Sequence, residues 1–365
     1  MKLLTIVGAR PQFIKAAPFS EKFRKVNEEI LIHTGQHYDK NMSNIFFEEL
    51  NIPKPDYQLS IGSGSHGTQT GAMLTEIEKV ILKENPDGIL VYGDTNSTLA
   101  GALAASKLHI PVFHVEAGLR SYNKLMPEEQ NRVLTDHIST LLLCPTKTAV
   151  ENLKSEGLVE NVINTGDIMY DVVLRNIDFA ETKYNSGAFI SELISENLVF
   201  DLEVGEKFYL STIHRAENTD APNKIIEILQ ALESLDYKVI LPIHPRTRKI
   251  INELSMELKN VLLINPVGYL MMLYLTKNAE MVITDSGGLQ KEAYFLETPC
   301  TTLRDQTEWI ETLENGWNVL SSINQNEIIK HVKRDLNCYK HPQPKHFGDG
   351  NAAENIANAI LEWRA

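Results

Sequence analysis

The sequence of 365 residues lacks the features that define several large classes of protein. Its three cysteines, Cys144, Cys300 and Cys338, lie far apart without a CxxC pair, so neither a disulfide framework nor a zinc site is expected. Lys and Arg number 35 against 48 Asp and Glu, and this acidic balance argues against a nucleic acid as partner. No apolar run is long enough to cross a membrane, and the amino terminus does not read as a signal peptide. We therefore expect a cytoplasmic globular protein with neither a membrane nor a nucleic acid as partner.

Common cofactor and catalytic motifs are also missing. The sequence has no GxGxxG turn of a dinucleotide fold, no HExxH zinc motif and no GxSxG elbow of a serine hydrolase. Its 11 histidines include no close pair with the spacing of metal ligands. We expect no metal and no nicotinamide or other cofactor.

Short apolar runs alternate with helical patterns along most of the chain, which predicts parallel sheets with crossover helices. The expected strands are 3–7, 29–33, 88–92, 111–115, 141–145 and 162–165, then 208–213, 238–242, 261–264, 281–284 and 300–303. We predict an α/β fold of two doubly wound, Rossmann-like domains. Because ligands of open parallel sheets bind beyond the carboxyl ends of the strands, we expect the cleft between these domains. The predicted domains are residues 1–170 and 171–349, with a helix at 350–365 that packs back on the N-terminal domain.

The most informative segment is TDSGGLQKE at residues 284–292, which follows an apolar run and opens a helix. A strand, a turn of small residues and a helix start place backbone N–H groups toward an anion. The segment lies too late in the chain for the first turn of a dinucleotide fold. It indicates a cradle for a diphosphate or a nucleotide sugar, and the alternative is an ordinary strand-to-helix turn.

Two cations follow the first expected strand. Arg10 and Lys15 lie in the segment GARPQFIK, near the start of a helix whose dipole adds positive potential. Such a site would stabilise a departing diphosphate, whereas the alternative is that both side chains are solvated surface cations.

Two carboxylates follow neighbouring strands of the same half. Asp94 begins the helix that follows 88–92, so it is either a functional group or only a helix cap. Glu116 ends the apolar strand 111–115, where a lone carboxylate is costly unless it is paired or poised for proton transfer. We favour a functional role for Glu116.

A third carboxylate opens the helix that begins with PEEQNR. Glu128 and Arg132 are four residues apart, so we expect the guanidinium to share a helix face with the carboxylate and to orient it. Asp94, Glu116 and Glu128 should converge at one edge of the sheet. Carboxylates on both sides of one sugar carbon could remove a proton from one face and return it to the other.

Two histidines end strands of the second half, His214 in STIHRAEN and His244 in LPIHP. We expect both to face the cleft. Either could hydrogen-bond a phosphate or carry a proton near neutrality, and the alternative is an imidazole satisfied by loop backbone.

Taken together, seven segments in order resemble the non-hydrolysing UDP-N-acetylglucosamine 2-epimerase family across nearly the whole chain: GARPQFIK, GDTNSTLA, HVEAGLRS, PEEQNR, STIHRAEN, LPIHP and TDSGGLQKEA. The resemblance implies a glycosyltransferase-B-like fold, an isomerase and a homodimer. It also implies inversion of C2 by anti elimination of UDP, through a 2-acetamidoglucal, followed by protonation from the other face and re-addition of UDP. The expected function is the interconversion of UDP-GlcNAc and UDP-ManNAc for surface polysaccharide synthesis.

The same resemblance assigns residues. Asp94, Glu116 and Glu128 match the acid/base carboxylates of the family, and Arg132 and His214 match its other catalytic positions. The residues implied to hold UDP are Arg10, Lys15, His214, Ser286, Gly287, Gly288 and Glu292. Of these, Glu292 would bind the ribose hydroxyls, a task suited to an acceptor-only carboxylate.

The departures from the family pattern concern substrate choice. Trp309 stands where the best-known members carry an arginine, so the resemblance implies that Trp309 selects the substrate. Trp309 and the pair Gln12-Phe13 resemble the residues of the branch that acts on UDP-2,3-diacetamido-2,3-dideoxy-glucuronate. That nucleotide sugar stays open as an alternative substrate.

An activator site is matched only in part. Gln36, His37 and His244 match positions that bind a second UDP-GlcNAc in some members, but Asp39 replaces a glutamine. The glycine-rich loop at 61–67 offers no matching arginine and suits either a flap or a plain connection.

Two other functions remain as alternatives. A retaining glycosyltransferase can use the same two-domain fold, and a nucleotide-sugar sensor would bind UDP-sugars without chemistry.

Overall fold

The computed structural model describes residues 1–36, 53–62, 64–184, 187, 189, 193, 202–203, 205–243, 245–254, 256–340 and 343–363. The chain forms two compact units. The first comprises Met1–Val172 and Lys345–Ala365, and the second comprises Val173–Pro344. Each unit is an α/β assembly around one parallel sheet.

The sheet of the first unit has seven parallel strands in the order β3-β2-β1-β4-β5-β6-β7. They are β1 (Lys2–Val7), β2 (Glu28–His33), β3 (Tyr57–Gln58), β4 (Gly88–Tyr92), β5 (Val112–Val115), β6 (Leu141–Cys144) and β7 (Val162–Asn164). The strand order reverses between β1 and β4, and this switch point is where open parallel sheets bind ligands. The segments that follow β1, β4 and β5 therefore meet at the expected functional edge of this sheet.

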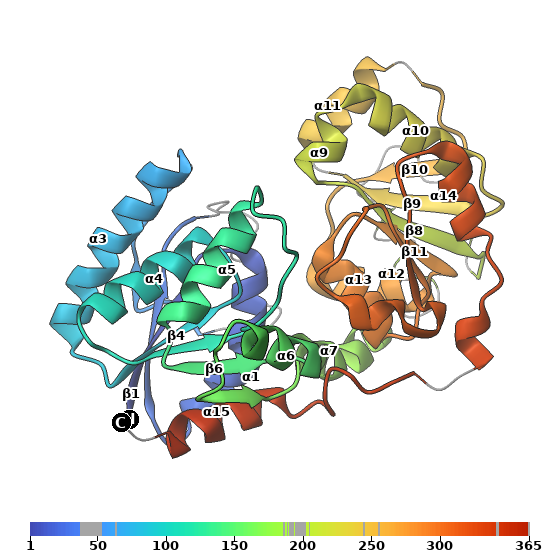
Figure 1. Cartoon of the computed structure of the whole chain (residues 1–365). Helices are drawn as coiled ribbons and strands as arrows, with labels where there is room; N and C mark the ends of the chain where they lie inside the picture. Colours follow the sequence, from blue (N-terminus) through green and yellow to red (C-terminus); the bar gives the residue numbers. More distant parts are fainter. Residues whose placement is uncertain are drawn as a thin grey trace. The chain divides into compact units, whose positions relative to one another are not determined.

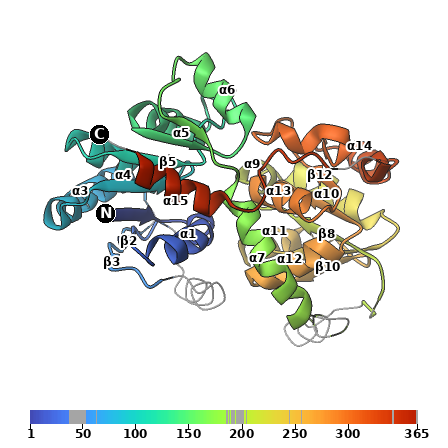
Figure 2. The same cartoon turned by 90° about the horizontal axis from the view of Figure 1, so that it is seen from below.

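Helices cover both faces of this sheet. They are α1 (Arg10–Phe23), α3 (His66–Glu84), α4 (Asn96–Lys107), α5 (Pro127–Ile138), α6 (Lys147–Ser155) and α15 (Ala352–Glu362), and α7 (Ile168–Lys183) carries the chain into the second unit. Helices α3, α4 and α5 pack side by side, and α15 packs against α1 (Figures 1 and 2). The Asp171 carboxylate accepts hydrogen bonds from the backbone N–H groups of Ala352 and Ala353 and so anchors the start of α15.

The sheet of the second unit has six parallel strands in the order β10-β9-β8-β11-β12-β13. They are β8 (Phe208–Thr212), β9 (Lys238–Pro242), β10 (Val261–Ile264), β11 (Met281–Thr284), β12 (Cys300–Thr302) and β13 (Asn318–Leu320). Its helices are α9 (Ala216–Thr219), α10 (Pro222–Glu233), α11 (Pro245–Glu253), α12 (Tyr269–Asn278), α13 (Gly287–Phe295), α14 (Gln325–Val332) and the 3₁₀ helices η1 (Ile310–Gly316) and η2 (Asn337–Lys340). The order reverses between β8 and β11, so the segments that end these two strands are neighbours.

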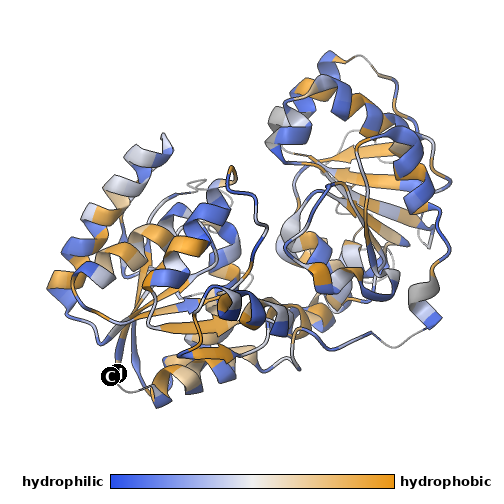
Figure 3. Ribbon diagram, viewed as in Figure 1, coloured by the Kyte–Doolittle hydropathy of each residue, from blue (hydrophilic) through white to orange (hydrophobic). Residues whose placement is uncertain are grey.

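The central strands are buried on both faces, which is why they read as unbroken apolar runs in the sequence. Figure 3 shows both sheets as hydrophobic layers flanked by helices with polar outer faces. The predicted α/β fold of two doubly wound sheets is confirmed. The sequence did not predict β3 and β13. For β3 the reason is its length, since two residues are too few to show a period. Among the residues described, no helix is long and apolar enough to cross a membrane.

Candidate active site

The segment between β1 and α1 brings two predicted cations to the switch point. Arg10 is the first residue of α1 and is half-buried, and Lys15 lies one turn later and is buried. The Lys15 ammonium forms an ion pair with the Glu116 carboxylate. Both side chains are about nine-tenths removed from solvent, so each needs the other's charge. Lys15 is therefore not a surface cation.

Gln12 holds this segment against the next strand. Its side-chain oxygen accepts from the N–H groups of Gly8 and Ala9 at 2.8 and 3.1 Å, and its amide donates to the Tyr92 carbonyl at 2.7 Å. A glutamine can do both because it carries a donor and an acceptor on one group, which a carboxylate does not. Gln12 thus fixes the start of α1 relative to β4.

Glu116 has an unusual backbone. Its φ of 71° lies in the left-handed region, although it is not glycine, and its N–H donates to the Leu143 carbonyl on β6 at 3.0 Å. Such a conformation costs about 1–3 kcal/mol and persists where the surroundings enforce it, commonly at functional sites. The result is a carboxylate that turns away from the line of β5 to meet Lys15.

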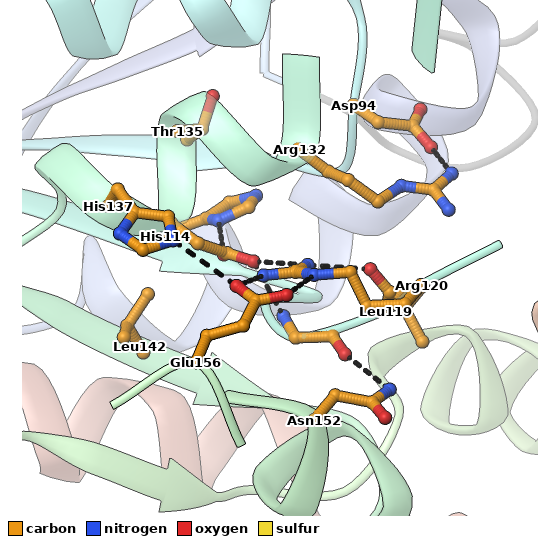
Figure 4. Close-up of polar contacts among 12 residues, drawn as sticks. Asp94, His114, Leu119, Arg120, Arg132, Thr135, His137, Leu142, Asn152 and Glu156 are labelled. Atoms are coloured by element: carbon orange, nitrogen blue, oxygen red, sulfur yellow. Dashed lines mark hydrogen bonds and ion pairs between the residues drawn. The ribbon is translucent and has the colours of Figure 1, made fainter. Parts of the chain in front are cut away.

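Asp94 follows β4 and is held by Arg132 of α5, as Figure 4 shows. Thr95, and not Asp94, caps α4, since its hydroxyl accepts from the Thr98 N–H. The cap alternative for Asp94 is therefore wrong. Arg132 is buried, whereas the Asp94 side chain retains 30% exposure, so the guanidinium holds the carboxylate from one side and leaves it accessible.

The expected pairing of Glu128 with Arg132 is wrong. Arg132 makes its ion pairs with Asp94 and with Glu129, which is 3.1 Å away, while Glu128 is exposed in the first turn of α5. Neighbours three and four apart both lie on the same helix side, and here the inward position is that of Glu129. The Glu129 carboxylate also accepts from the N–H groups of Ser121 and Tyr122, which ties the loop after β5 to α5.

In the second unit, His214 follows β8 and is paired with Asp285, which follows β11. The His214 Nδ1 lies 3.0 Å from Asp285, and Asp285 also accepts from the backbone N–H of His214 and Arg215 and from the Asn218 amide. Burial opposes the charge of Asp285, but these donors, His214 first, hold the pKa of its carboxyl below the ordinary value. This pairing leaves the His214 side chain 58% exposed.

The segment TDSGG forms the predicted turn into α13. Ser286 is the N-cap, because its hydroxyl accepts from the Leu289 N–H at 3.3 Å, and Gly287 and Gly288 are the first helical residues. A Cβ on Gly287 would lie 2.6 Å from an oxygen of the Glu308 carboxylate, so any larger residue would have to displace that side chain. Glu292 lies in the next turn and is largely buried. The start of α13 thus offers backbone N–H groups of the kind that bind phosphate.

Trp309 is buried, with 4% of its surface exposed. The Lys291 ammonium lies 3.7 Å from the centre of the indole ring, a cation–π contact inside the unit. The neighbouring pair of Arg304 and Glu308, 3.1 Å apart, lies beside Gly287. Trp309 is therefore part of the packing that surrounds the α13 turn.

Some sequence predictions fall elsewhere. His37, Asp39 and His244 lie outside the described residues. Gln36 accepts from the N–H and hydroxyl of Ser97 at the start of α4. In the glycine-rich loop, Ser65 caps α3 and His66 is its first residue. Within the described part of the chain, no group of three or more His, Cys, Asp or Glu side chains could hold a metal ion.

Comparison with known proteins decides the family. The sequence pattern of the UDP-N-acetylglucosamine 2-epimerase family matches residues 21–361. The chain belongs to this family. A "UDP-N-acetylglucosamine 2-epimerase homolog" of Methanococcus maripaludis is 51% identical over 99% of both chains. A "UDP-2,3-diacetamido-2,3-dideoxy-D-glucuronate 2-epimerase" of Pseudomonas aeruginosa is 49% identical over 99% of this chain and 100% of the relative.

A solved structure agrees with this placement. The UDP-GlcNAc 2-epimerase of Methanocaldococcus jannaschii, crystallised with UDP-GlcNAc and UDP, superposes with a TM-score of 0.88 at 46% identity and covers 99% of both chains. The resemblance inferred from seven motifs is confirmed, and the members of the epimerase family are isomerases.

Several supporting residues of this epimerase fold were missed by sequence reasoning. Asp285 and Gln12 lie inside motifs that were recognised, but their partners are distant in sequence. Glu129 was passed over for its neighbour Glu128. One sequence signal could have found these residues: each is polar and lies either at the end of an apolar strand or on the inward side of a helix.

Proposed function

We propose that the chain is a non-hydrolysing UDP-N-acetylglucosamine 2-epimerase. A base takes the C2 proton, the C2 electrons form the C1=C2 bond of 2-acetamidoglucal, and the C1–O bond breaks to release UDP. UDP then adds back after C2 is protonated on the opposite face, which gives UDP-ManNAc. The observation that carries the proposal is that Asp94 and Glu116, each paired with a buried cation, follow adjacent strands at the switch point of the first sheet.

The proposal gives each predicted residue a task. Asp94, Glu116 and Glu128 would act as acid and base, and Arg132 would orient Asp94. Lys15 is held by Glu116, so an incoming diphosphate would compete for the same ammonium and change the charge around the carboxylate. Arg10 would share the diphosphate with Lys15.

The second unit would bind the nucleotide. The N–H groups of Gly287 and Gly288 and the Ser286 hydroxyl suit the diphosphate, and stronger binding of UDP as it departs is what lowers the barrier. His214, oriented by Asp285, would donate to the same group, and Glu292 would accept from the ribose hydroxyls.

The second candidate substrate is UDP-2,3-diacetamido-2,3-dideoxy-glucuronate. Two observations favour it: the 49% identity to the Pseudomonas aeruginosa enzyme of that name, and Trp309 in place of the arginine of the best-known members. The chemistry at C2 would be the same, and the difference would lie in the groups around C3 and C6.

The test is proton NMR of the purified protein in deuterium oxide, with each of the two nucleotide sugars in turn. Deuterium entering C2 together with a manno epimer would support the epimerase and identify its substrate. Epimerisation without deuterium would exclude elimination. Transfer of the sugar to an acceptor without exchange would favour a glycosyltransferase, and binding alone would favour a sensor.

We also propose a cytoplasmic homodimer that supplies a ManNAc-type donor for surface polysaccharide, as expected from the family resemblance. Light scattering coupled to size-exclusion chromatography tests the assembly, since the monomer has a mass of 41.2 kDa. Fractionation of the native host tests the location.

A further inference from the structure

A buried histidine that was not among the predicted site residues contacts the backbone next to Asp94. His114 is the third residue of β5, its side chain is fully buried, and it faces α5 (Figure 4). Its Nδ1 lies 2.7 Å from an oxygen of Asp136 on α5, and its Nε2 lies 2.8 Å from the backbone carbonyl oxygen of Gly93. Both ring nitrogens therefore face acceptors.

The carbonyl contact determines one proton. A carbonyl oxygen only accepts, so Nε2 must carry hydrogen. A neutral ring with its hydrogen on Nε2 would turn a bare Nδ1 lone pair toward the Asp136 carboxylate, which is repulsive unless Asp136 itself is protonated. The charge of the ring therefore depends on whether Asp136 is ionised.

The surroundings of Asp136 favour the carboxylate. Its second oxygen accepts from the Arg120 guanidinium at 2.7 Å and from the Gly118 N–H at 3.1 Å. Burial opposes the charge, but the Arg120 guanidinium and the Gly118 N–H, which act without His114, favour the ionised carboxylate. Both ring nitrogens of His114 then carry hydrogen.

The remaining charges around this group balance. Arg120 also pairs with Glu156, which follows α6, at 2.6 and 2.8 Å, and the exposed His137 ring lies 3.2 Å from the same carboxylate. On β6, burial raises the pKa of the Cys144 thiol, which keeps it neutral. A charged His114, Asp136, Arg120 and Glu156 form two cations and two anions, so a buried imidazolium needs no further counter-ion.

The carbonyl that His114 holds belongs to the turn that carries Asp94. Gly93 has a φ of 62°, and its N–H donates to the Val115 carbonyl at 3.0 Å. A Cβ on Gly93 would lie 3.2 Å from the Glu116 carboxylate, so the turn also packs against the second predicted carboxylate. A hydrogen bond from a charged donor is about twice as strong as a neutral one.

We propose that His114 donates a hydrogen bond from each of its two ring nitrogens and that it is a positioning residue, which fixes the turn from Gly93 to Asp94. The positioning role rests on the proposed function, whereas the donation from both nitrogens does not.

The first experiment locates the hydrogens on the His114 ring in the wild-type protein. Long-range proton–nitrogen NMR of ¹⁵N-histidine-labelled protein, with His114 assigned by its loss in His114→Gln, should show hydrogen on both ring nitrogens. A bare ring nitrogen would overturn the inference. This measurement needs no turnover, so a wild-type protein without C2 exchange would contradict the proposed function while the NMR result still decided the donation by His114.

The second experiment measures positioning. A Gln or Asn side chain cannot donate in both directions, so His114→Gln and His114→Asn should lower kcat for C2 exchange about 100-fold, with KM and UDP affinity within about 3-fold of wild type. His109→Asn is the matched control, since His109 is exposed and has a left-handed φ of 58° that asparagine tolerates. A purely structural role would lower the melting temperature and leave kcat of the folded fraction unchanged, and that result would overturn the positioning claim.

Discussion

Two adjacent glutamates of α5 have opposite environments. Glu129 is buried and accepts from Arg132, Ser121 and Tyr122, whereas Glu128 is exposed. Glu129→Gln removes the more deeply buried of the two carboxylates paired with Arg132, and we expect the free energy of unfolding to fall by about 3 kcal/mol. Glu128→Gln should change it by less than about 0.5 kcal/mol but should slow C2 exchange by about 100-fold.

Urea unfolding and NMR exchange assays of both variants check this pair of predictions. The exposed Glu151, also on a helix, provides Glu151→Gln as a control that should alter neither quantity. A Glu129→Gln protein as stable as wild type would contradict the structural role of Glu129, and a fully active Glu128→Gln protein would contradict the catalytic role of Glu128.

The ionisation of Asp285 should make the free energy of unfolding depend on pH. Its folded-state pKa is lowered, so its contribution is complete above the unfolded value of about 4 and is lost as the pH falls through the folded value. Wild-type protein should therefore lose more unfolding free energy between about pH 6 and 3 than Asp285→Asn, which has no carboxyl there. Urea unfolding at both pH values measures the difference. An equal loss of unfolding free energy in the two proteins would show that the pair of His214 and Asp285 contributes nothing.

At the scale of single residues, the sequence predicted where polar side chains follow the strands but not what those side chains contact. Glu116 was singled out because a carboxylate at the end of an apolar strand is costly. Its positive φ and its pairing with Lys15, 101 residues away, depend on the packing of β5 against β6 and on the start of α1. No local pattern carries that information.

At the scale of elements, the turn into α13 leaves little room for a side chain at Gly287. Gly287→Ala would place a methyl group 2.6 Å from the buried Glu308 carboxylate and displace its pair with Arg304. We expect a loss of about 1–3 kcal/mol in unfolding free energy and weaker UDP binding. Gly288→Ala is the matched variant for stability, because its nearest neighbour atom is 3.9 Å away and it should cost little.

Thermal unfolding and calorimetric titration with UDP test this contrast. Equal stability losses at the two glycines would show that the close approach to Glu308 is relieved by a small shift. The turn itself was predictable, since a strand, small residues and a helix start follow one another in sequence. The Glu308 contact was not, because it comes from a segment that follows β12.

At the scale of the whole molecule, each unit has its own buried core around its own sheet. The alternation of apolar strands and helices was enough to predict this, because period and run length determine the class of fold. The formal net charge of -13 adds a constraint, since an anionic nucleotide sugar must find local cations on an acidic protein. Lys15 and Arg10 in the first unit and the start of α13 in the second provide positive potential.

If the second unit binds the nucleotide and the first unit carries the acid/base carboxylates, ligands should protect the two units from hydrogen exchange differently. UDP alone, at about 100 times its Kd, should stabilise the folded state by about 2.7 kcal/mol and slow exchange most at residues 213–218 and 286–289, where the nucleotide is assigned. A ligand with the sugar should add protection at 93–98 and 115–121, because those segments carry Asp94 and Glu116. UMP is the control, since one phosphate fewer should weaken protection at the α13 turn. Protection by UDP confined to the first unit would mean that the TDSGG turn is an ordinary strand-to-helix connection and that the diphosphate is held by Arg10 and Lys15 instead.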